Sequence, residues 1–334
     1  MIRIGLVGAG SMAGVYAQSA ASLPNADVTA VASPNTAETF VAEQVPTGTA
    51  YSDAETMFDE AAIDAVAVLT PTHTHHEFVE GAAERGLDVI CEKPIARTLD
   101  QAARIRTAVE ESGITFLTAH VVRFFPEYAE AKRLVESGDI GTPGVARARR
   151  AFGIGGNRGW FEDREKSGGV LLDVAVHDFD YLRWVFGDVE EVFTRRTNWT
   201  REARSEVSIT LAEFENGAKG HVEAWTVQVS NIPFTTTFEL CGDKGLIEFD
   251  LEDVRPYVVH DGETTHVPRD PVGDDLPIAQ DGYDKQLEHF LACIEGDAEP
   301  LIPVEEGIES LRVSLAAIES AERGVPVDPS EVNA

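Results

Sequence analysis

The chain has 334 residues, a length that favours two domains, and 43% of them are hydrophobic, enough to bury a core. No stretch approaches the run of about 18 uncharged apolar residues of a membrane-spanning helix, so we exclude an integral membrane protein. The formal net charge is −31, from 27 basic and 58 acidic residues, and this acidity excludes a nucleic acid partner, because phosphate binding requires a basic patch.

Short apolar strands alternate with helical segments in the first part of the chain. The predicted strands are residues 2–7, 28–32, 65–69, 87–91 and 114–119. Ser52 with Glu55, and Thr98 with Gln101, have the spacing of a capping box and mark the starts of two helices. Strands this apolar, each followed by a helix, indicate a parallel sheet covered on both faces. We predict a doubly wound α/β domain over residues 1–122.

The pattern changes in the second part of the chain. A helix is predicted over residues 126–137, with Pro126 at its start. Strand patterns then dominate, over residues 145–152, 189–199, 205–215, 220–229, 234–241 and 245–250. Residues 216–217 and 243–245 are hairpin signals, which predict antiparallel neighbours.

One helix, residues 169–186, interrupts these strands, and two more, residues 283–295 and 304–323, close the chain. Residues 256–277 are predicted as a long polar hairpin or loop. Alternating polar and apolar side chains along the strands indicate a sheet with one face that its own helices leave uncovered. We predict an α+β domain with an open, mostly antiparallel sheet over residues 123–334, whose last helix is a candidate to pack on the first domain.

Gly8, Gly10 and Ala13 form the pattern GxGxxA directly after the first strand. The first glycine permits a tight turn, the second lets the backbone approach a pyrophosphate, and the small third residue lets helix and strand pack closely. Backbone amides at the start of the helix, with Ser11 and Met12, then bind the pyrophosphate. The pattern predicts a Rossmann dinucleotide-binding domain, with a glycine-rich turn that binds no ligand as the alternative.

The end of the second strand bears on the choice between NADP and NAD. A carboxylate usually holds the ribose of NAD there, whereas this strand ends Ala32-Ser33-Pro34-Asn35. Ser33 and Asn35 could hydrogen-bond a 2′-phosphate without repelling it, although no arginine follows to pair with it. We expect NADP or NAD, and the missing carboxylate favours NADP. The alternative is a turn without a cofactor role.

Thr70 and Pro71 follow the next long strand, at the edge where the cofactor crevice is expected. His73, His75 and His76 come soon after. A metal site would need further ligands around an open position, and we expect no metal. We expect His75 to face the cofactor, and His73 and His76 to be solvated at a helix start.

Glu92, Lys93 and Pro94 follow the strand of residues 87–91. Pro94 biases Lys93 toward an extended conformation, from which its ammonium could project into the crevice. Only six lysines occur in the chain, so one at this edge suggests a function. We include Glu92 and Lys93 among the cofactor-binding candidates, with a surface lysine before a turn as the alternative.

Asp173 and His177 lie four residues apart in the predicted helix of residues 169–186, on one face. A carboxylate and an imidazole one turn apart can contact adjacent atoms of one substrate. A pair on the helix surface is the alternative. We expect Asp178 and Asp180 to be solvated or to cap a helix.

Five motifs occur once each along the chain: GxGxxA at Gly8, TPxxxH at residues 70–75, EKP at 92–94, RFFPEY at 123–128 and GGxxxDxxxH at 168–177. In these motifs the chain resembles the glucose-fructose oxidoreductase and inositol 2-dehydrogenase family, written Gfo/Idh/MocA, over almost its whole length. The resemblance implies a nucleotide-binding domain followed by an α/β domain, whose open sheet is often buried in a dimer or tetramer. The missing ribose carboxylate departs from the family pattern, and the substrate region matches no single member.

The resemblance implies oxidation of a secondary alcohol of a sugar, sugar acid or cyclitol by NAD(P), or the reverse reduction. By motif, the catalytic lysine and the Asp/His pair of the family map onto Lys93, Asp173 and His177. An imidazole with an ordinary pKa of about 6.5 suits His177 as a general base. Lys93 would stabilise charge that develops on the same oxygen, and Asp173 would orient a hydroxyl or the other two groups. Which group takes the proton is left open.

Three further residues, Arg123, Trp160 and Tyr283, are candidates for substrate contacts. Each has an alternative, since Arg123 could pair with acids, Trp160 could only pack, and Tyr283 could cap a helix. We expect a small-molecule substrate and a homodimer or homotetramer.

Two rival functions remain open. A non-catalytic NAD(P)-binding regulator is disfavoured by the presence of Lys93, Asp173 and His177 together. A different reaction on the same scaffold, such as reduction of an imine, an enone or a tetrapyrrole or redox-assisted glycoside cleavage, is disfavoured by the polar site.

The acidity and the scarcity of lysine suggest a cytoplasm of very high salt, because the Debye length falls to about 3 Å at 1 M and screens self-repulsion. The chain starts directly with a strand and without signal-peptide features, so we expect a cytoplasmic protein. Cys91, Cys241 and Cys293 are too few and too widely separated for a disulfide framework, and we expect buried free thiols. We treat the glycosylation sequon at residues 198–200 as chance.

Overall fold

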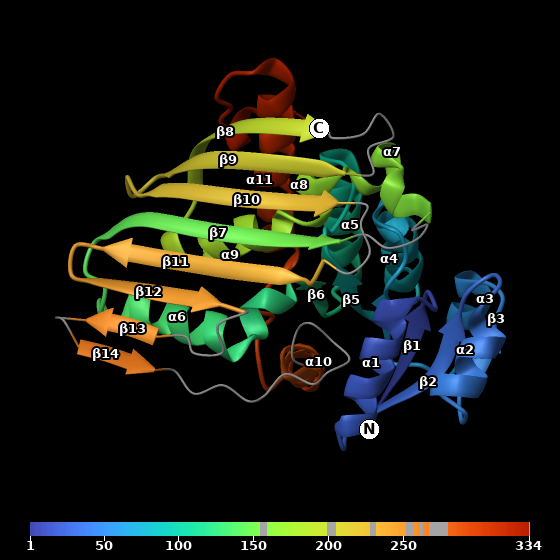
Figure 1. Cartoon of the computed structure of the whole chain (residues 1–334). Coiled ribbons are helices and arrows are strands. Elements are labelled where there is room, and N and C mark those ends of the chain that lie inside the picture. Colours follow the sequence, from blue (N-terminus) through green and yellow to red (C-terminus); the bar gives the residue numbers. More distant parts are fainter. Residues whose placement is uncertain are drawn as a thin grey trace. The chain divides into compact units, whose positions relative to one another are not determined.

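The computed structural model describes residues 1–153, 159–198, 205–227, 232–251, 257–260, 263–266 and 280–333. The chain forms two compact units (Figure 1). The first comprises Met1–Val121 with Ala279–Ile308, and the second comprises Val122–Ile278 with Glu309–Ala334. The segment that ends at Ile308 therefore belongs to the first unit, although it lies far along the sequence.

The first unit contains a six-stranded parallel sheet in the order β3-β2-β1-β4-β5-β6. Its strands are β1 (Ile2–Val7), β2 (Ala26–Ala32), β3 (Thr49–Tyr51), β4 (Ala65–Val68), β5 (Asp88–Glu92) and β6 (Phe116–Ala119). Its helices include α1 (Ser11–Ser22), α2 (Ala37–Gln44), α3 (Ala54–Glu60), α4 (His75–Ala83), α5 (Leu99–Ser112) and α10 (Gln280–Glu295). The predicted doubly wound sheet is confirmed, and the short edge strand β3 was not predicted.

Burial explains why these strands are so apolar. All four residues of β4 are fully buried, as expected of a central strand in a parallel sheet with helices on both faces. The capping prediction at Thr98 is confirmed, because its hydroxyl accepts a hydrogen bond from the Gln101 N–H at 3.2 Å. At α3, however, Asp53 and not Ser52 is the cap: the Asp53 carboxylate accepts the Thr56 N–H at 2.8 Å.

The second unit contains an eight-stranded sheet in the order β14-β13-β12-β11-β7-β10-β9-β8. Its strands are β7 (Pro143–Gly153), β8 (Val189–Asn198), β9 (Glu206–Phe214), β10 (Lys219–Val227), β11 (Thr235–Gly242), β12 (Gly245–Asp250), β13 (Tyr257–His260) and β14 (Glu263–His266). All pairs are antiparallel except β7 with β10. The predicted α+β class with a mostly antiparallel sheet is confirmed.

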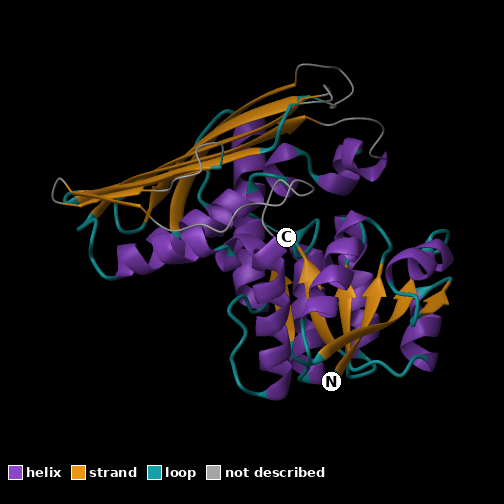
Figure 2. Ribbon diagram, turned by 60° about the horizontal axis from the view of Figure 1, so that its bottom comes forward, coloured by secondary structure: helices purple, strands orange, loops and turns teal. Residues whose placement is uncertain are grey.

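Helices of this unit cover one face of the sheet (Figure 2). They include α6 (Pro126–Glu136), α8 (Val170–Asp173), α9 (Val176–Phe186) and the part of α11 (Val304–Arg323) from Glu309 onward. The short helix α7 (Arg164–Ser167) precedes α8. Tyr128 of α6 and Tyr181 of α9 form an edge-to-face pair with ring centroids 4.7 Å apart, and Tyr128 also contacts Phe238 of β11. This aromatic cluster holds α6 and α9 against the sheet.

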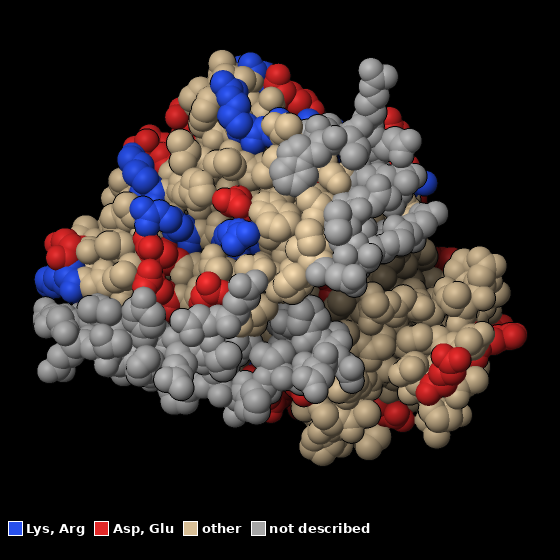
Figure 3. Space-filling model, viewed as in Figure 1, with Lys and Arg blue, Asp and Glu red and all other residues tan. Residues whose placement is uncertain are grey.

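The opposite face of the same sheet exposes apolar side chains. Val145 of β7 and Ile209 and Leu211 of β9 are among the exposed large hydrophobic residues. Charged pairs lie between them, such as Arg149 of β7 with Glu223 of β10. Figure 3 shows basic and acidic side chains side by side over these strands, so the net acidity of the chain does not exclude local pairing.

The helix predicted over residues 169–186 is interrupted, which corrects that prediction. α8 ends at Asp173 and α9 begins at Val176. The Ala175 N–H bonds to the Val170 carbonyl, five residues back, at 2.9 Å, so one extra residue enters the turn between the helices. Asp173 and His177 thus belong to two successive helices, and they do not lie one turn apart on a single continuous helix.

Other expectations are partly resolved. Within the segment 256–277, β13 and β14 form an antiparallel hairpin, and the remaining residues lie outside the described ones, as do residues 199 and 200 of the sequon. The three cysteines are free, but Cys241 is partly exposed and only Cys91 and Cys293 are buried. Within the described residues, no helix has the length and apolar character to cross a membrane.

Candidate functional site

The turn between β1 and α1 has the conformation that the glycine pattern predicts. Gly8 has φ +107°, and a Cβ there would lie 2.9 Å from the Leu69 carbonyl oxygen, so this position requires glycine. Gly10 is the N-cap residue directly before α1, and a Cβ there would meet nothing within 4 Å. Ala13 is fully buried. The two glycines therefore serve different purposes, a tight turn at Gly8 and an open approach at Gly10.

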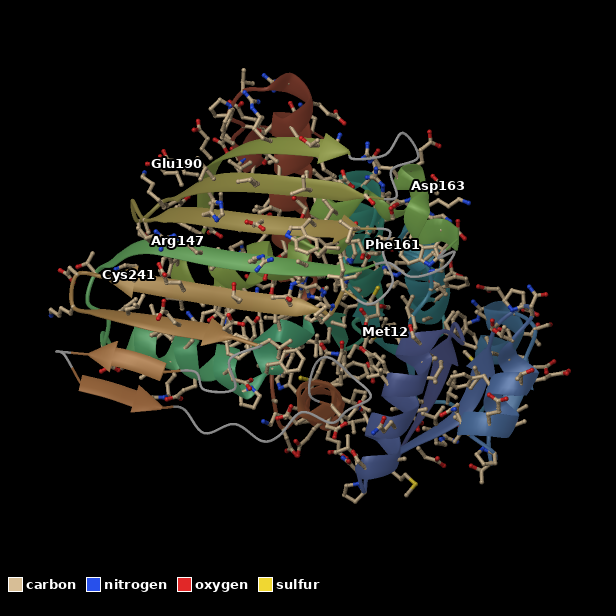
Figure 4. All side chains as sticks on the ribbon, viewed as in Figure 1. Met12, Arg147, Phe161, Asp163, Glu190 and Cys241 are labelled. Carbon is tan, nitrogen blue, oxygen red and sulfur yellow. The ribbon has the colours of Figure 1, made fainter. Side chains whose placement is uncertain are left out.

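This helix start fits a dinucleotide pyrophosphate. No side chain caps the N-terminus of α1, so its first backbone N–H groups remain available to a bound anion. Ser11 is exposed and Met12, labelled in Figure 4, is half-buried beside it. The open space beside Gly10 and the uncapped amides are the features that such a cofactor needs.

The end of β2 carries hydroxyl and amide groups. The Ser33 hydroxyl hydrogen-bonds the Thr36 hydroxyl at 2.7 Å, and the Ser33 N–H donates to the Tyr51 carbonyl at 3.1 Å. Asn35 is exposed. No carboxylate occurs between Ser33 and Ala37, so a negatively charged 2′-phosphate would meet no like charge on these residues.

Thr70 and Pro71 lead from β4 into a 3₁₀ turn before α4. The Thr74 hydroxyl donates to the Thr70 hydroxyl at 2.9 Å and also lies 2.7 Å from the Pro71 carbonyl. The His75 ring lies between two carbonyl oxygens, with Nδ1 3.0 Å from that of Pro94 and Nε2 2.8 Å from that of Thr70. His75 therefore joins the chain segments that follow β4 and β5.

The burial of one of these histidines corrects a prediction. His75 is 1% exposed, and burial lowers its pKa to about 4. Its ring is held between two backbone carbonyls, and the expectation that it faces the cofactor stays a prediction. His76 is buried as well, and burial lowers its pKa, so it is not the solvated residue we expected. Among the described residues, no group of three His, Cys, Asp or Glu side chains could hold a metal ion.

Lys93 follows the last residue of β5, at the same carboxyl edge of the sheet as Gly10. The Lys93 N–H donates to the Glu92 carboxylate at 3.2 Å. Glu92 is 9% exposed, whereas Lys93 is partly exposed. The Glu92 carboxylate thus fixes the backbone at the point where the lysine side chain leaves the strand.

The α8 and α9 helices hold Asp173 and His177 in the second unit. Gly168 and Gly169, with φ of +78° and +75°, turn the chain into α8. The Glu206 carboxylate of β9 then accepts the Val170 N–H at 3.0 Å and an Arg164 N–H at 2.9 Å. This buried carboxylate anchors the start of α8 to the sheet.

Asp178 and Asp180 are buried, which corrects the expectation that they are solvated or cap a helix. Asp178 accepts two hydrogen bonds from Arg150 of β7, at 2.9 and 3.2 Å. Burial raises the pKa of Asp178, against the effect of Arg150. Asp180 accepts hydrogen bonds from Arg123 at 2.7 and 2.9 Å and from the Ser310 hydroxyl at 2.7 Å. These pairs fix the first turn of α9, where His177 lies.

Arg123 is therefore an internal anchor of α9. Its side chain is 2% exposed, bonds Asp180 in a bidentate manner and lies over the Trp184 ring at 5.4 Å. The alternative that it pairs with an acid is confirmed, and a direct contact with substrate is not supported. Trp160 is partly exposed beside Phe161, which is labelled in Figure 4. Tyr283 of α10 is partly exposed in the first unit.

Sequence reasoning missed four polar residues that fix the site. Glu206 and Arg150 anchor α8 and α9. The Tyr16 hydroxyl donates to the Glu92 carboxylate at 3.5 Å and accepts the Gln286 amide at 3.0 Å. A signal existed for Arg150, because alternation along β7 places it on the same buried face as Ala146 and Ala148.

Two family models match this chain, one in each part of the sequence. A family model described as "Oxidoreductase family, NAD-binding Rossmann fold" matches residues 2–120, and one described as "Oxidoreductase family, C-terminal alpha/beta domain" matches residues 132–328. The scyllo-inositol 2-dehydrogenase (NAD(+)) of Bacillus subtilis is 28% identical over 98% of this chain and 96% of its own length. The 1,5-anhydro-D-fructose reductase of Ensifer adhaerens is 30% identical over 97% of both chains.

A solved structure supports the same fold. Levoglucosan dehydrogenase, in a complex with NADH and levoglucosan, superposes with a TM-score of 0.86 at 23% identity and covers 99% of this chain and 100% of its own.

Proposed function

Since the chain belongs to the Gfo/Idh/MocA family of NAD(P)-dependent oxidoreductases, we propose that it is a dehydrogenase. It would transfer a hydride between the nicotinamide and a secondary alcohol carbon of a sugar, sugar acid or cyclitol. The observation that carries the proposal is the carboxyl edge of the first sheet, where the open helix start at Gly10 and the lysine after β5 lie on one edge. The inositol and anhydrosugar substrates in the names of the relatives support this substrate class.

The residues divide the chemistry as follows in this proposal. When bound, the nicotinamide supplies hydride transfer. His177 takes the proton of the reacting hydroxyl, because histidine is the side chain that most often serves as a general base in enzymes. Lys93 hydrogen-bonds the same oxygen and stabilises its developing negative charge. Asp173 orients a substrate hydroxyl or the other two groups.

The pocket for the cofactor follows from the first unit. Gly8, Gly10, Ala13 and the α1 amides of Ser11 and Met12 would hold the pyrophosphate. Thr70, Pro71 and Glu92 would border the crevice. Ser33 and Asn35 would contact the ribose side, and we propose NADP over NAD because no carboxylate stands there to repel a 2′-phosphate. Trp160 and Tyr283 remain proposed substrate contacts.

The test is a nicotinamide absorbance assay over a panel of sugars, sugar acids and cyclitols with NAD and NADP. We expect turnover of at least one polyol, and His177→Ala should lower the turnover number by roughly 10² to 10⁴ while cofactor binding survives. Cofactor binding without turnover of any polyol would favour the regulator. An unchanged turnover number in His177→Ala would remove that residue from the mechanism.

We also propose that the open face of the eight-stranded sheet is a subunit interface in a homodimer or homotetramer. Val145, Ile209 and Leu211 are 36%, 44% and 53% exposed on it, and apolar side chains grouped on one face mark interaction sites. Arg147 and Cys241, labelled in Figure 4, lie on neighbouring strands of this sheet. Sedimentation tests the proposal, and Leu211→Glu should shift the protein toward monomer. A wild-type protein that sediments as a monomer would contradict it.

A further inference from the structure

We propose that Tyr16 and Gln286 are positioning residues for Lys93 and act through the Glu92 carboxylate. This inference rests on the proposed function, in which Lys93 contacts the reacting oxygen. Gln286, Tyr16 and Glu92 form a buried series of hydrogen bonds, the polar chain, that links helices α1 and α10 to the end of β5. All of them belong to the first unit.

Three hydrogen bonds make up the polar chain and connect it to Lys93. The Gln286 amide donates to the Tyr16 hydroxyl at 3.0 Å. The Tyr16 hydroxyl donates to Glu92 Oε1 over a longer distance of 3.5 Å. Glu92 Oε2 accepts the Lys93 N–H at 3.2 Å. Each carboxylate oxygen of Glu92 thus faces a different donor, one from α1 and one from the turn that carries the lysine.

Tyr16 remains a donor under all ordinary conditions. Its side chain is 3% exposed, and burial, together with the nearby Glu92 carboxylate, raises the pKa of Tyr16 well above its usual value. Its hydroxyl oxygen already accepts the Gln286 amide, so the hydroxyl proton needs another acceptor. Glu92 supplies that acceptor, and a buried carboxylate gains stability from each donor it faces.

The position of Tyr16 on α1 connects the polar chain to the proposed cofactor site. Tyr16 lies on α1, whose first turn carries the proposed pyrophosphate site, and Lys93 lies at the end of β5. The link through Glu92 therefore ties the helix that would bind the cofactor to the residue that would act on the substrate. Gln286, which is fully buried on α10, fixes the Tyr16 hydroxyl from the other side.

A neighbouring contact provides a matched control. Ser19 lies one turn further along α1, is 1% exposed, and accepts a hydrogen bond from the Gln280 amide of α10 at 2.7 Å. Ser19→Ala thus removes a partly buried hydrogen bond between the same two helices without changing any contact of Glu92. Tyr16→Phe removes only the hydroxyl of Tyr16 and keeps its ring in place.

The first measurement needs no substrate. The chain has six lysines, and reductive methylation with ¹³C-formaldehyde labels their amines, together with the N-terminal amine, for NMR. Lys93→Arg identifies the signal of Lys93. We expect Tyr16→Phe and Gln286→Leu to move or split this signal by more than its line width, and Ser19→Ala to leave it in place. An unmoved signal in Tyr16→Phe, or an equal change in Ser19→Ala, would overturn the proposal.

The second measurement uses the polyol with the highest turnover in the panel. We expect Tyr16→Phe to lower kcat by about 10-fold with little change in cofactor Kd, since a misplacement of about 1 Å costs up to 10²-fold. In a Lys93→Met background the same substitution should change kcat less than about twofold, because effects that pass through one residue are not additive. If Tyr16→Phe lowered kcat by the same factor in both backgrounds, Tyr16 would have a structural role that does not act through Lys93.

The two measurements separate this inference from the proposed function. If the Lys93 signal responds to Tyr16→Phe but Lys93→Met keeps wild-type turnover, the polar chain braces the turn and the catalytic role of Lys93 is wrong. If the signal does not respond, the positioning role fails whatever the activity of the enzyme.

Discussion

The buried ring of His75 predicts a loss of stability as the pH falls. Burial lowers its pKa from 6.5 to about 4 in the folded chain, whereas the same imidazole titrates near 6.5 when unfolded. Between these values the unfolded state binds more protons, so the unfolding free energy falls as pH falls through this range. The difference, at roughly 1.36 kcal/mol for each pKa unit, amounts to about 3 kcal/mol that is present above pH 6.5 and lost by about pH 4.

Urea unfolding at several pH values between about 4 and 7 measures this effect. His75→Gln replaces the titrating ring by an amide that does not titrate, and His221→Gln, on the strand β10, is the control. Carboxylates titrate equally in all three proteins, so the difference between wild type and His75→Gln isolates the ring. Between about pH 7 and pH 4 we expect the unfolding free energy of the wild type and of the control to fall by about 3 kcal/mol more than that of His75→Gln. Parallel curves for wild type and His75→Gln would refute the reasoning.

Three further predictions concern the cofactor site, the anchor of α9 and the net charge. Gly10→Val should lower NAD(P) affinity at least about tenfold in fluorescence titration, because the new side chain occupies the space proposed for the pyrophosphate. The melting temperature should change little, because a Cβ there meets no protein atom within 4 Å; unchanged affinity would contradict the prediction. Asp178→Ala should cost about 3–5 kcal/mol in urea unfolding, because the Arg150 guanidinium stays buried without its partner; a loss below about 1 kcal/mol would refute this. Melting temperature should rise between about 0.1 and 1 M KCl as screening weakens the repulsion of a −31 chain, and a salt-independent value would contradict the idea of a high-salt cytoplasm.

The first sheet was predictable because its signals are local. Each predicted strand of the first unit is a short apolar run between turn signals, and Gly8 lies where only glycine adopts φ +107°. The edge strand β3 escaped prediction because its three residues are too short to establish a pattern. The second sheet was predictable from the alternation along its strands and from its hairpin turns.

The supports of the site were not predictable because they depend on contacts between distant residues. Asp178 and Asp180 looked like surface acids, but their partners Arg150 and Arg123 lie 28 and 57 residues away. Gln286 is 270 residues from Tyr16. The break between α8 and α9 occurs without a proline or glycine at Val174 and Ala175, so local propensity gave no warning of it.

Hydride transfer to NAD(P) by the purified protein, followed at the absorbance of the reduced nicotinamide with a sugar and cyclitol panel, tests the proposed dehydrogenase activity most directly. We predict turnover by the wild type, with the turnover numbers of His177→Ala and Lys93→Met reduced by roughly 10² to 10⁴ at unchanged cofactor affinity. A wild type that binds the cofactor and reduces none of it with any polyol would contradict the proposed activity, as would two variants that turn over at the wild-type rate.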